Sequence, residues 1–176
     1  MFELFIAMIE KPLVTVITVC YNAVSLIEKT IRSVLAQQYE HIEYVVVDGG
    51  STDGTIEIIR KYEAHISHWI TEQDEGIYDA MNKGVAMATG EWCIFLNAGD
   101  TFAADDVLNR VFQVPREADV IYGDVVKNGT VKVAEPPHNS HRMYFCHQSC
   151  LTRTACLRTF PYDTSHRMSA DFKLYK

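Results

Sequence analysis

The fold of this chain is constrained most strongly by two apolar segments rich in β-branched residues, at positions 13–19 and 42–47. Neither segment alternates strictly between polar and apolar residues, as expected of strands buried on both faces of a parallel sheet. Between the two segments, apolar residues recur at the spacing of one helical face, at positions 27, 31, 34 and 35. A buried strand, a helix and a second buried strand predict a parallel βαβ unit.

The same alternation continues along the chain. The patterns predict helices over 55–62, 77–88 and 104–112, and strands over 68–71 and 92–96. Ser25 followed by Glu28 has the spacing of a capping box at the start of the first helix, and Gly90 is expected to end the third. The sequence therefore predicts an α/β fold, with a Rossmann-like, mainly parallel central sheet flanked by helices.

After Asp119 the pattern changes. Predicted strands at 120–126 and 130–133 flank Asn128-Gly129, a two-residue hairpin signal, and a less regular stretch follows. We expect an N-terminal extension over 1–11 and one domain over 12–176. Its halves are a nucleotide-binding half, 12–118, and an acceptor-side half, 119–176. The last residues look like the first turns of an unfinished helix, so we expect a truncated C-terminus.

Composition excludes several classes of protein. The net charge of −7 and the lack of a Lys/Arg run argue against a nucleic-acid-binding protein. Five cysteines at irregular spacing favour a reducing compartment over a disulfide framework. Glu3 and Glu10 do not fit a signal peptide, and no segment approaches the length of a membrane span. We expect a cytoplasmic protein, or one that is peripheral at the inner face of the membrane.

Polar residues follow each of the first four predicted strands. They are Tyr21 and Asn22, then Asp48, then Glu72 and Asp74, and finally Asn97 and Asp100. Ligands of open α/β sheets bind at the carboxyl ends of the strands. We therefore expect the ligand site at this edge of the sheet.

The stretch VVVDGGSTDGT, at 45–55, matches neither a P-loop nor a dinucleotide fingerprint nor an EF-hand. One interpretation is that Asp48 accepts a hydrogen bond from a ligand N–H, such as a base imide. Gly49 and Gly50 would then let that ligand approach the backbone closely. The alternative is a tight turn in which Asp53 caps the next helix.

The stretch FLNAGD places Asp100 three residues after Asn97. Asp100 is a candidate ligand for Mg²⁺ or Mn²⁺, with Asn97 as a weaker oxygen ligand; helix capping near Thr101 is the alternative. In EQDEGIYDAMNKG, three polar residues lie on the non-core side of a helix, which is either a site wall or a solvated face. These are Asp79, Asn82 and Lys83.

The later part of the chain has several histidines and cysteines. His138, His141, Cys146, His147 and Cys150 do not match the spacing of a structural zinc site. His147 and Gln148 are better interpreted as substrate contacts on the acceptor side. Asp171, near a helix start, is either a helix-dipole partner or a catalytic base.

Taken together, these motifs resemble the inverting family 2 glycosyltransferases of the GT-A fold, especially bacterial members that build exopolysaccharide and other envelope glycans. The resemblance implies a UDP-, GDP- or dTDP-sugar donor, a Mn²⁺ or Mg²⁺ ion at Asp100, and Asp171 as catalytic base. The implied nucleotide-sugar site comprises Val19, Tyr21, Asn22, Asp48, Gly49, Ser51, Asp53, Asp79, Asn82, Lys83, Asn97 and Ala98. The chain departs from the acidic metal motif of the family at Asn97 and Gly99.

The resemblance further implies a glycan or lipid-linked acceptor, and it allows peripheral membrane contact or a homodimer. Two alternatives stay open at this point. A sugar-phosphate nucleotidyltransferase would use a similar frame, but VCYNAVS lacks its glycine-rich basic loop. A non-catalytic nucleotide- or glycan-binding module would tolerate the changes at Asn97 and Gly99.

Overall fold

The structure is a computed structural model, and it describes residues 11–114, 117–136 and 145–165. Six strands form one sheet in the order β3-β2-β1-β4-β8-β5. They are β1 (Val14–Cys20), β2 (Ile42–Asp48), β3 (His68–Thr71), β4 (Trp92–Phe95), β5 (Val120–Tyr122) and β8 (Cys150–Arg153). The first four strands are mutually parallel, and β8 is antiparallel to both of its neighbours. The predicted mainly parallel sheet is therefore confirmed.

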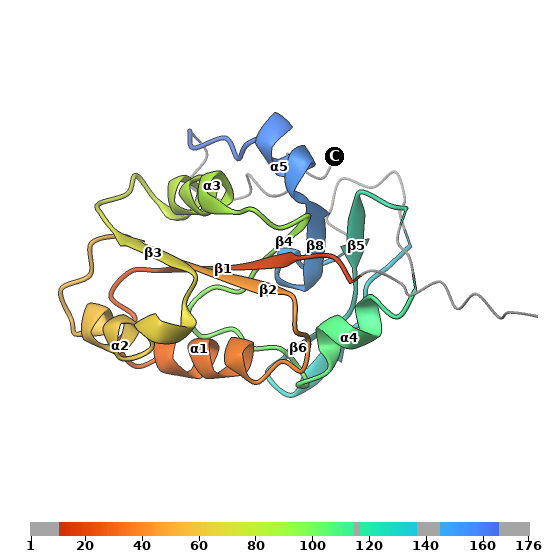
Figure 1. The fold of residues 1–176 in the computed structure, drawn as a ribbon, viewed down its shortest axis with the longest axis horizontal. Coiled ribbons are helices and arrows are strands. Elements are labelled where there is room, and N and C mark those ends of the chain that lie inside the picture. Colours follow the sequence, from red (N-terminus) through yellow and green to blue (C-terminus); the bar gives the residue numbers. More distant parts are fainter. Residues whose placement is uncertain (1–10, 115–116, 137–144, 166–176) are drawn as a thin grey trace, which may run out of the picture.

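Helices cover both faces of this sheet (Figure 1). On one face lie α1 (Ile27–Leu35), α2 (Thr55–Lys61) and α4 (Val107–Val111), and on the other lie α3 (Ile77–Met87) and α5 (Thr154–Thr159). Short 3₁₀ turns, η1 (Glu63–His65) and η2 (His147–Ser149), precede β3 and β8. No helix of the described ranges is long and apolar enough to span a membrane.

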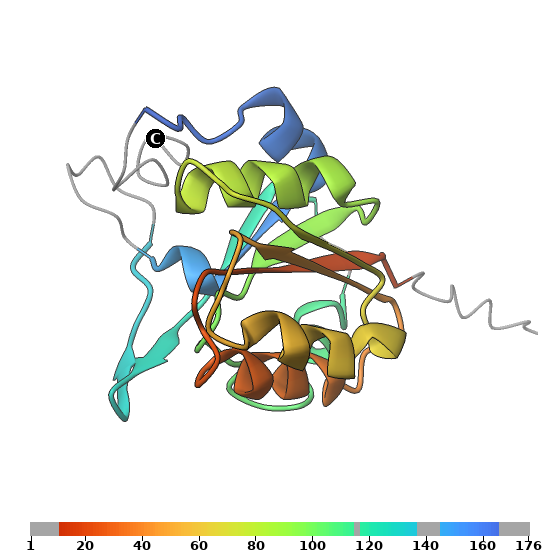
Figure 2. The same cartoon turned by 90° about the vertical axis from the view of Figure 1, so that its left-hand side faces the viewer.

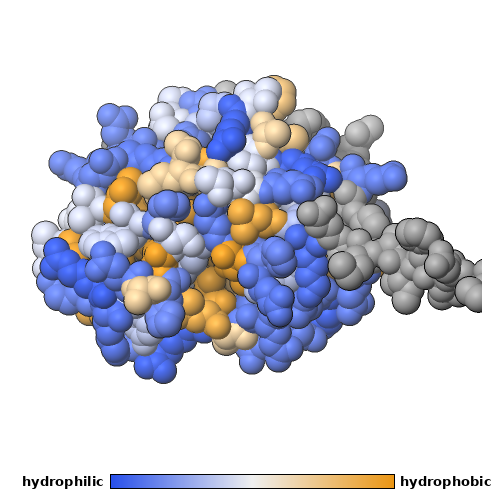
Figure 3. All heavy atoms as spheres, in the orientation of Figure 1, coloured by the Kyte–Doolittle hydropathy of each residue, from blue (hydrophilic) through white to orange (hydrophobic). Residues whose placement is uncertain are grey.

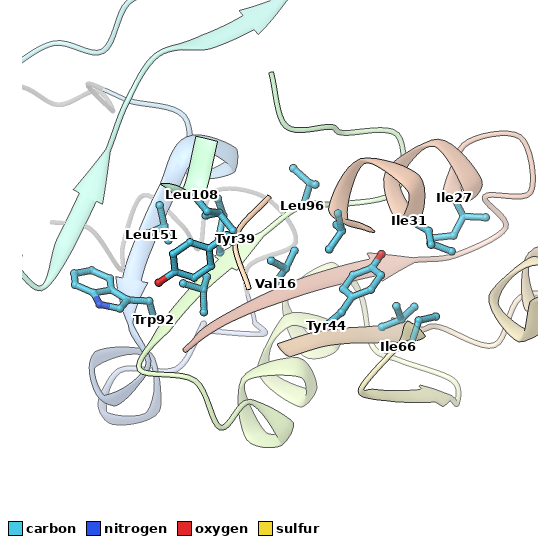
Figure 4. Packing of buried hydrophobic residues seen from close by; sticks show 14 of the residues in the cluster. Val16, Ile27, Ile31, Tyr39, Tyr44, Ile66, Trp92, Leu96, Leu108 and Leu151 are labelled. Atoms are coloured by element: carbon cyan, nitrogen blue, oxygen red, sulfur yellow. The ribbon is translucent and has the colours of Figure 1, made fainter. Parts of the chain in front are cut away.

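The two faces of the sheet build two separate cores. Along β2, Tyr44 and Val46 pack on the α1 side, and Val45 and Val47 pack on the α3 side. Because side chains alternate across a strand, an uninterrupted apolar run supplies both cores at once. Figure 4 shows the first core, in which Ile31 of α1 lies against the sheet. This explains why the buried strands do not alternate in sequence.

The second core requires close contact between α3 and the sheet. A Cβ at Gly84 would lie 2.5 Å from Cγ2 of Ile17, so only glycine lets the helix pack at this distance. Met81 and Val85 of the same helix are buried on either side of this contact. Glycine at position 84 therefore allows α3 to pack this closely against β1.

A separate hairpin projects beside the sheet (Figure 2). It consists of β6 (Val125–Lys127) and β7 (Thr130–Lys132), paired antiparallel. Asn128 and Gly129 connect them with φ angles of 53° and 74°, which is the two-residue turn predicted from the sequence. The prediction of one strand over 120–126 was wrong, because β5 ends at Tyr122 and pairs with β8 in the main sheet.

Three other predictions of local structure were wrong. Gly90 does not cap the third helix, because α3 ends at Met87 and Ala88 is its C-cap. Ser25 and Glu28 do not form a capping box, because α1 begins after Leu26, whose backbone N–H donates to the carbonyl of Ala23. The carboxylate of Glu28 is instead bound by Arg32, Lys61 and Tyr62. The helix predicted over 104–112 is shorter, Val107–Val111. The strand β8 and helix α5 lie in a stretch that had no regular pattern.

Candidate functional site

The candidate site lies at the carboxyl edge of the parallel strands. β1 lies between β2 and β4, and Cys20, the last residue of β1, is in register with Asp48. Asp48 is in turn in register with Thr71, the last residue of β3. The loops that follow these strands therefore emerge side by side, as the sequence predicted. On the face shown in Figure 3, hydrophobic residues gather between the helices below the sheet and α3 above it.

Asp48 is wholly buried and holds the loop that follows β2. Its carboxylate accepts hydrogen bonds from the backbone N–H groups of Gly50, at 3.1 Å, and Ser51, at 2.9 Å. It also accepts from the hydroxyls of Ser51, at 2.5 Å, and Thr71, at 2.7 Å. A carboxylate with this many internal donors is an anchor for the loop. Recognition of a base by Asp48 stays a prediction.

The loops after β1 and β2 are joined by reciprocal hydrogen bonds. The N–H of Asn22 donates to Oγ of Ser51 at 2.7 Å, and Oδ1 of Asn22 accepts from the N–H of Thr52 at 2.9 Å. Asn22 has a positive φ of 47°, an uncommon conformation in which asparagine is enriched. Three of the predicted ligand contacts, Asn22, Asp48 and Ser51, thus bind one another.

Asp53 extends the same junction. Its Oδ2 accepts from the N–H of Val24 at 3.0 Å, and its Oδ1 accepts from the N–H and the hydroxyl of Thr55 at the start of α2. The hydrogen bond from the Thr55 hydroxyl, which outweighs partial desolvation, holds the pKa of Asp53 below its usual value. Asp53 therefore accepts from the first N–H of α2, which confirms part of the capping interpretation. The residue at the N-cap position, however, is Gly54 and not Asp53.

One side chain beside this junction, that of Tyr21, is exposed to solvent. Tyr21 is 63% exposed, at the first position after β1, whereas the side chain of Val19 is buried. The carbonyl of Val19 accepts from the N–H of Ala98 at 3.1 Å, which joins the end of β1 to the turn after β4. Tyr21 is thus free to present its ring to a planar ligand.

Gly49 brings the loop after β3 close to the loop after β2. A Cβ at this position would overlap Oδ2 of Asp74. The other oxygen of Asp74 accepts from the N–H of Gly76 at 2.9 Å, at the start of α3. The glycine therefore makes room for the carboxylate of Asp74, and close approach of a ligand at this position stays a prediction. Asp74 was predicted to follow a strand end, but no role was predicted for it.

The turn after β4 carries two side chains whose oxygen atoms could bind a metal ion, those of Asn97 and Asp100. The N–H of Asp100 donates to the carbonyl of Asn97 at 2.8 Å. The hydroxyl of Thr30 on α1 binds the turn twice at 2.8 Å, accepting from the N–H of Gly99 and donating to the carbonyl of Asp100. Thr30 was not predicted as a site residue. These bonds fix Asn97 and Asp100 relative to each other.

The side chains of this turn fit a hard cation. Oδ1 of Asn97 is buried and has no hydrogen-bond partner among the described residues. Burial raises the pKa of the half-buried Asp100, and Coulombic interactions with His147 and Lys29 act against this. An orphaned amide oxygen and a partly desolvated carboxylate, three residues apart, are the type of donors that Mg²⁺ and Mn²⁺ prefer. The described residues contain no cluster of three His, Cys, Asp or Glu side chains that could hold a metal by themselves.

The structure brings His147 to the same turn. It lies in η2, directly before β8, and β8 pairs with β4. His147 is near enough to Asp100 for its charge to affect the pKa of that carboxyl. Gln148 is the next residue of η2 and is half-buried. Their predicted contact with an acceptor stays a prediction, and His138 and His141 lie outside the described residues.

The polar residues of α3 are engaged in internal contacts. Nζ of Lys83 lies 2.9 Å from Oε1 of Glu72, 3.1 Å from Oδ2 of Asp79 and 3.2 Å from the carbonyl of Gln73. The hydrogen bond to Glu72 is the main reason that the pKa of Lys83 is raised. Asp79 and Lys83 thus hold the β3–α3 loop beside the site.

Asn82, one helical position before Lys83, binds the main chain of Tyr162 instead. Asp171, the predicted catalytic base, lies outside the described residues. The site as described therefore consists of the loops after β1, β2, β3 and β4, together with η2.

Comparisons with known proteins agree with this geometry. Residues 15–172 match the model of a family described as glycosyl transferase family 2. A PGL/p-HBAD biosynthesis glycosyltransferase of Mycobacterium tuberculosis is 33% identical over 172 residues, covering 92% of this chain and 67% of the relative. The putative teichuronic acid biosynthesis glycosyltransferase TuaG of Bacillus subtilis is 41% identical over 100 residues, 54% of this chain and 39% of TuaG.

Two solved structures show the same fold. Residues 1–349 of Staphylococcus aureus TarS, in complex with UDP, superpose with a TM-score of 0.76 at 22% identity. A mannosyltransferase of Pyrobaculum calidifontis, in complex with GDP-Man and Mn²⁺, gives a TM-score of 0.71 at 23% identity. This chain is covered to 92% and 93%, but it spans only 53% and 52% of those two chains.

Proposed function

Since this chain belongs to glycosyl transferase family 2 and has the GT-A fold, we propose that it transfers a sugar from a nucleotide-diphospho-sugar to a hydroxyl group, with inversion. The observation that supports this best is the turn after β4, at the carboxyl edge of the parallel strands. There Oδ1 of Asn97 is buried without a hydrogen-bond partner among the described residues, and the carboxylate of Asp100, three residues later, is half-buried. The glycan would belong to the bacterial cell envelope, and the relatives in PGL/p-HBAD and teichuronic acid biosynthesis support this.

Different loops would bind the base and the diphosphate of the donor. We place the base against the exposed ring of Tyr21, beside the backbone of the Gly49–Ser51 turn that Asp48 holds in shape. The diphosphate would lie toward the turn after β4, with Asn97 and Asp100 as protein ligands of Mn²⁺ or Mg²⁺. A divalent cation there would supply positive charge next to the leaving diphosphate.

The residues of the chain would perform the transfer in one displacement. Asp171 takes the proton from the acceptor hydroxyl, whose oxygen forms a bond to the anomeric carbon as the bond to the diphosphate breaks. The electron pair of the broken bond leaves with the diphosphate. His147 and Gln148 would border the acceptor on the β8 side. The cleft contributes by holding the two reactants in line.

The donor site can be tested by calorimetric titration of UDP, GDP and dTDP, each with Mn²⁺ and with EDTA. We expect one nucleotide to bind in a metal-dependent manner and Asp100→Ala to weaken binding by about tenfold or more, since a charged ligand of the metal is lost. Asp106→Ala is the matched control, because Asp106 is an aspartate at the start of α4 that pairs with Arg110 at the surface. This control should bind like the wild type.

Two results would contradict the proposal in different ways. Tight binding that is indifferent to EDTA would remove the metal role of Asp100 and favour a metal-independent site. Absence of binding by every nucleotide, in a chain shown to be folded by circular dichroism, would refute the donor site.

A further inference from the structure

The buried hydroxyl of Thr30, in α1, lies against the turn that carries Asn97 and Asp100. It accepts from the N–H of Gly99 at 2.8 Å and donates to the carbonyl oxygen of Asp100 at 2.8 Å. The same oxygen lies 3.5 Å from the carbonyl oxygen of Asn97. A threonine hydroxyl within a helix often donates to a carbonyl of the preceding helical turn. Thr30 instead donates to a carbonyl 70 positions away.

These hydrogen bonds hold a particular backbone conformation of the turn. The N–H of Asp100 donates to the carbonyl of Asn97 at 2.8 Å, which closes a four-residue turn. Gly99, the third residue, has a φ of 101°, whereas the φ of Ala98, the second residue, is not positive. This combination is that of a type II turn. The N–H of Gly99 belongs to the central peptide group, whose orientation distinguishes a type II from a type I turn. Its bond to Thr30 therefore fixes the type of turn.

The helix that carries Thr30 is itself packed firmly against the sheet. Ile31, the next residue of α1, and Leu96, the residue before the turn, are buried in the same core (Figure 4). The N–H of Leu96 also donates to the carbonyl of Ile17 in β1 at 2.9 Å. The turn is thus held from two sides, by β1 through the backbone that leads into it and by α1 through Thr30.

Ser33 makes a comparable hydrogen bond one turn further along α1. Its Oγ accepts from the N–H of Phe102 at 2.8 Å. Thr30 and Ser33 are three residues apart, so they lie on the same face of the helix. Thr30 binds the backbone of Asp100 itself, whereas Ser33 binds the chain two residues beyond it. The two hydroxyls therefore allow the effect on the turn to be separated from a general effect on the segment.

We infer that Thr30 is a positioning residue that sets the affinity of the site for a divalent cation. This inference rests on the proposed function, in which Asn97 and Asp100 are the protein ligands of that cation. The two ligands are the first and last residues of the turn, so the distance between them depends on its conformation. Affinity for such cations depends on the charge of the ligands and on the rigidity of the site. Since only one of the two ligands is charged, the rigidity given by Thr30 is expected to matter strongly.

Three variants separate the hydroxyl from the rest of the side chain. Thr30→Val has nearly the same shape as the wild type but can bind neither Gly99 nor Asp100. Thr30→Ser keeps the hydroxyl and loses only the methyl group. Ser33→Ala is the matched control, because it removes one hydroxyl from the same helix face and leaves the turn intact. Thr30→Ala lacks the same hydroxyl and replaces Thr30→Val if the valine variant does not fold.

Mn²⁺ binding is measured from the electron paramagnetic resonance signal of free Mn²⁺, in the presence of UDP, GDP or dTDP, whichever binds in the calorimetric titration. Groups that orient metal ligands contribute about 10–100-fold to metal affinity, so we expect Thr30→Val to raise the Kd for Mn²⁺ by about tenfold or more. Thr30→Ser should stay within about threefold of the wild type and Ser33→Ala within about twofold. Thr30→Val and Ser33→Ala should both lower the midpoint of urea unfolding, because each leaves a backbone N–H without its acceptor.

The comparison between stability and Mn²⁺ affinity decides the outcome. A Thr30→Val variant that is less stable but binds Mn²⁺ within about twofold of the wild type would overturn the inference and leave Thr30 a structural role only. An equal loss of Mn²⁺ affinity in Ser33→Ala would also overturn it, since the effect would then belong to the whole segment. A wild type that binds no Mn²⁺ with any of the three nucleotides would instead refute the metal site of the proposed function, and the inference with it.

Discussion

The buried carboxylate of Glu43 joins three parts of the fold at the edge opposite the site. Oε2 accepts from the hydroxyl of Thr15 at 2.5 Å, the N–H of Thr89 at 2.6 Å and the N–H of Gly90 at 3.3 Å. Oε1 accepts from the Thr89 hydroxyl at 2.7 Å, and Glu43 is only 6% exposed. Burial by itself would raise the pKa of Glu43, but the hydrogen bonds from Thr15, Thr89 and Gly90 outweigh it and lower the pKa.

Replacing this carboxylate should destabilise the protein strongly. Glu43→Ala leaves the N–H of Thr89 without its acceptor, while the N–H of Gly90 keeps a bond to the Thr15 hydroxyl at 3.0 Å. A hydrogen bond to a charged group contributes about 1.5–3 kcal/mol, and a buried unsatisfied donor costs about 1–3 kcal/mol. Since these contributions overlap, we expect a loss of about 3–5 kcal/mol in the free energy of unfolding. Glu43→Gln keeps one oxygen for the backbone donors and should lose about 1–2 kcal/mol.

Urea unfolding followed by circular dichroism measures these differences. At pH 7 the order of stability should be wild type, Gln variant, Ala variant. Because the pKa of Glu43 is lower in the folded state, its stabilisation is present above the ordinary value of 4.5 and is lost as the pH falls through the folded value. The gap between the wild type and Glu43→Gln should therefore close in acid.

The exposed Glu57 on α2 supplies the control, and Glu57→Ala should lie within about 0.5 kcal/mol of the wild type. An Ala variant at position 43 that is as stable as this control at pH 7 would refute the reasoning. A gap between wild type and Glu43→Gln that does not change with pH would refute its electrostatic part.

Two further predictions concern packing and surface charge. Gly84→Ala would place a Cβ 2.5 Å from Cγ2 of Ile17, so we expect a net loss of about 1–3 kcal/mol in urea unfolding despite the better helix propensity of alanine. Hydrogen bonds from Tyr62 and Lys61 lower the pKa of Glu28 to about 2, so its stabilisation is present above pH 4.5 and is lost toward pH 2. Glu28→Gln should remove this acid-sensitive contribution, and 1 M salt should shrink the difference from the wild type in thermal unfolding.

The sequence by itself determined the layered architecture, because a strand that is buried on both faces is recognisable as a run of apolar residues. β2 shows this clearly, since Tyr44 and Val46 enter one core and Val45 and Val47 the other. A strand of this kind carries consecutive apolar residues, as at 44–47, so its run is visible without coordinates. The edge of the sheet that holds the polar residues follows from the same reasoning, because parallel strands end on one side.

The tertiary structure alone decided what each polar residue at that edge does. Asp48, Asn22 and Ser51 have side chains suited to a ligand, yet the structure engages them with one another. Asn97, by contrast, keeps a buried side-chain oxygen for which the described residues supply no hydrogen-bond partner. Sequence spacing cannot distinguish these cases, since a hydrogen-bond partner can come from a loop 30 residues away.

Asn82 is the clearest example of this limit. Its motif predicts a polar helix face, and helical spacing places Asp79, Asn82 and Lys83 together. The partner of Asn82 is the main chain of Tyr162, 80 residues later in an irregular segment. Backbone N–H and C=O groups are present at every residue and leave no pattern in a sequence. A contact between a side chain and a distant backbone is therefore determined by the folded chain alone.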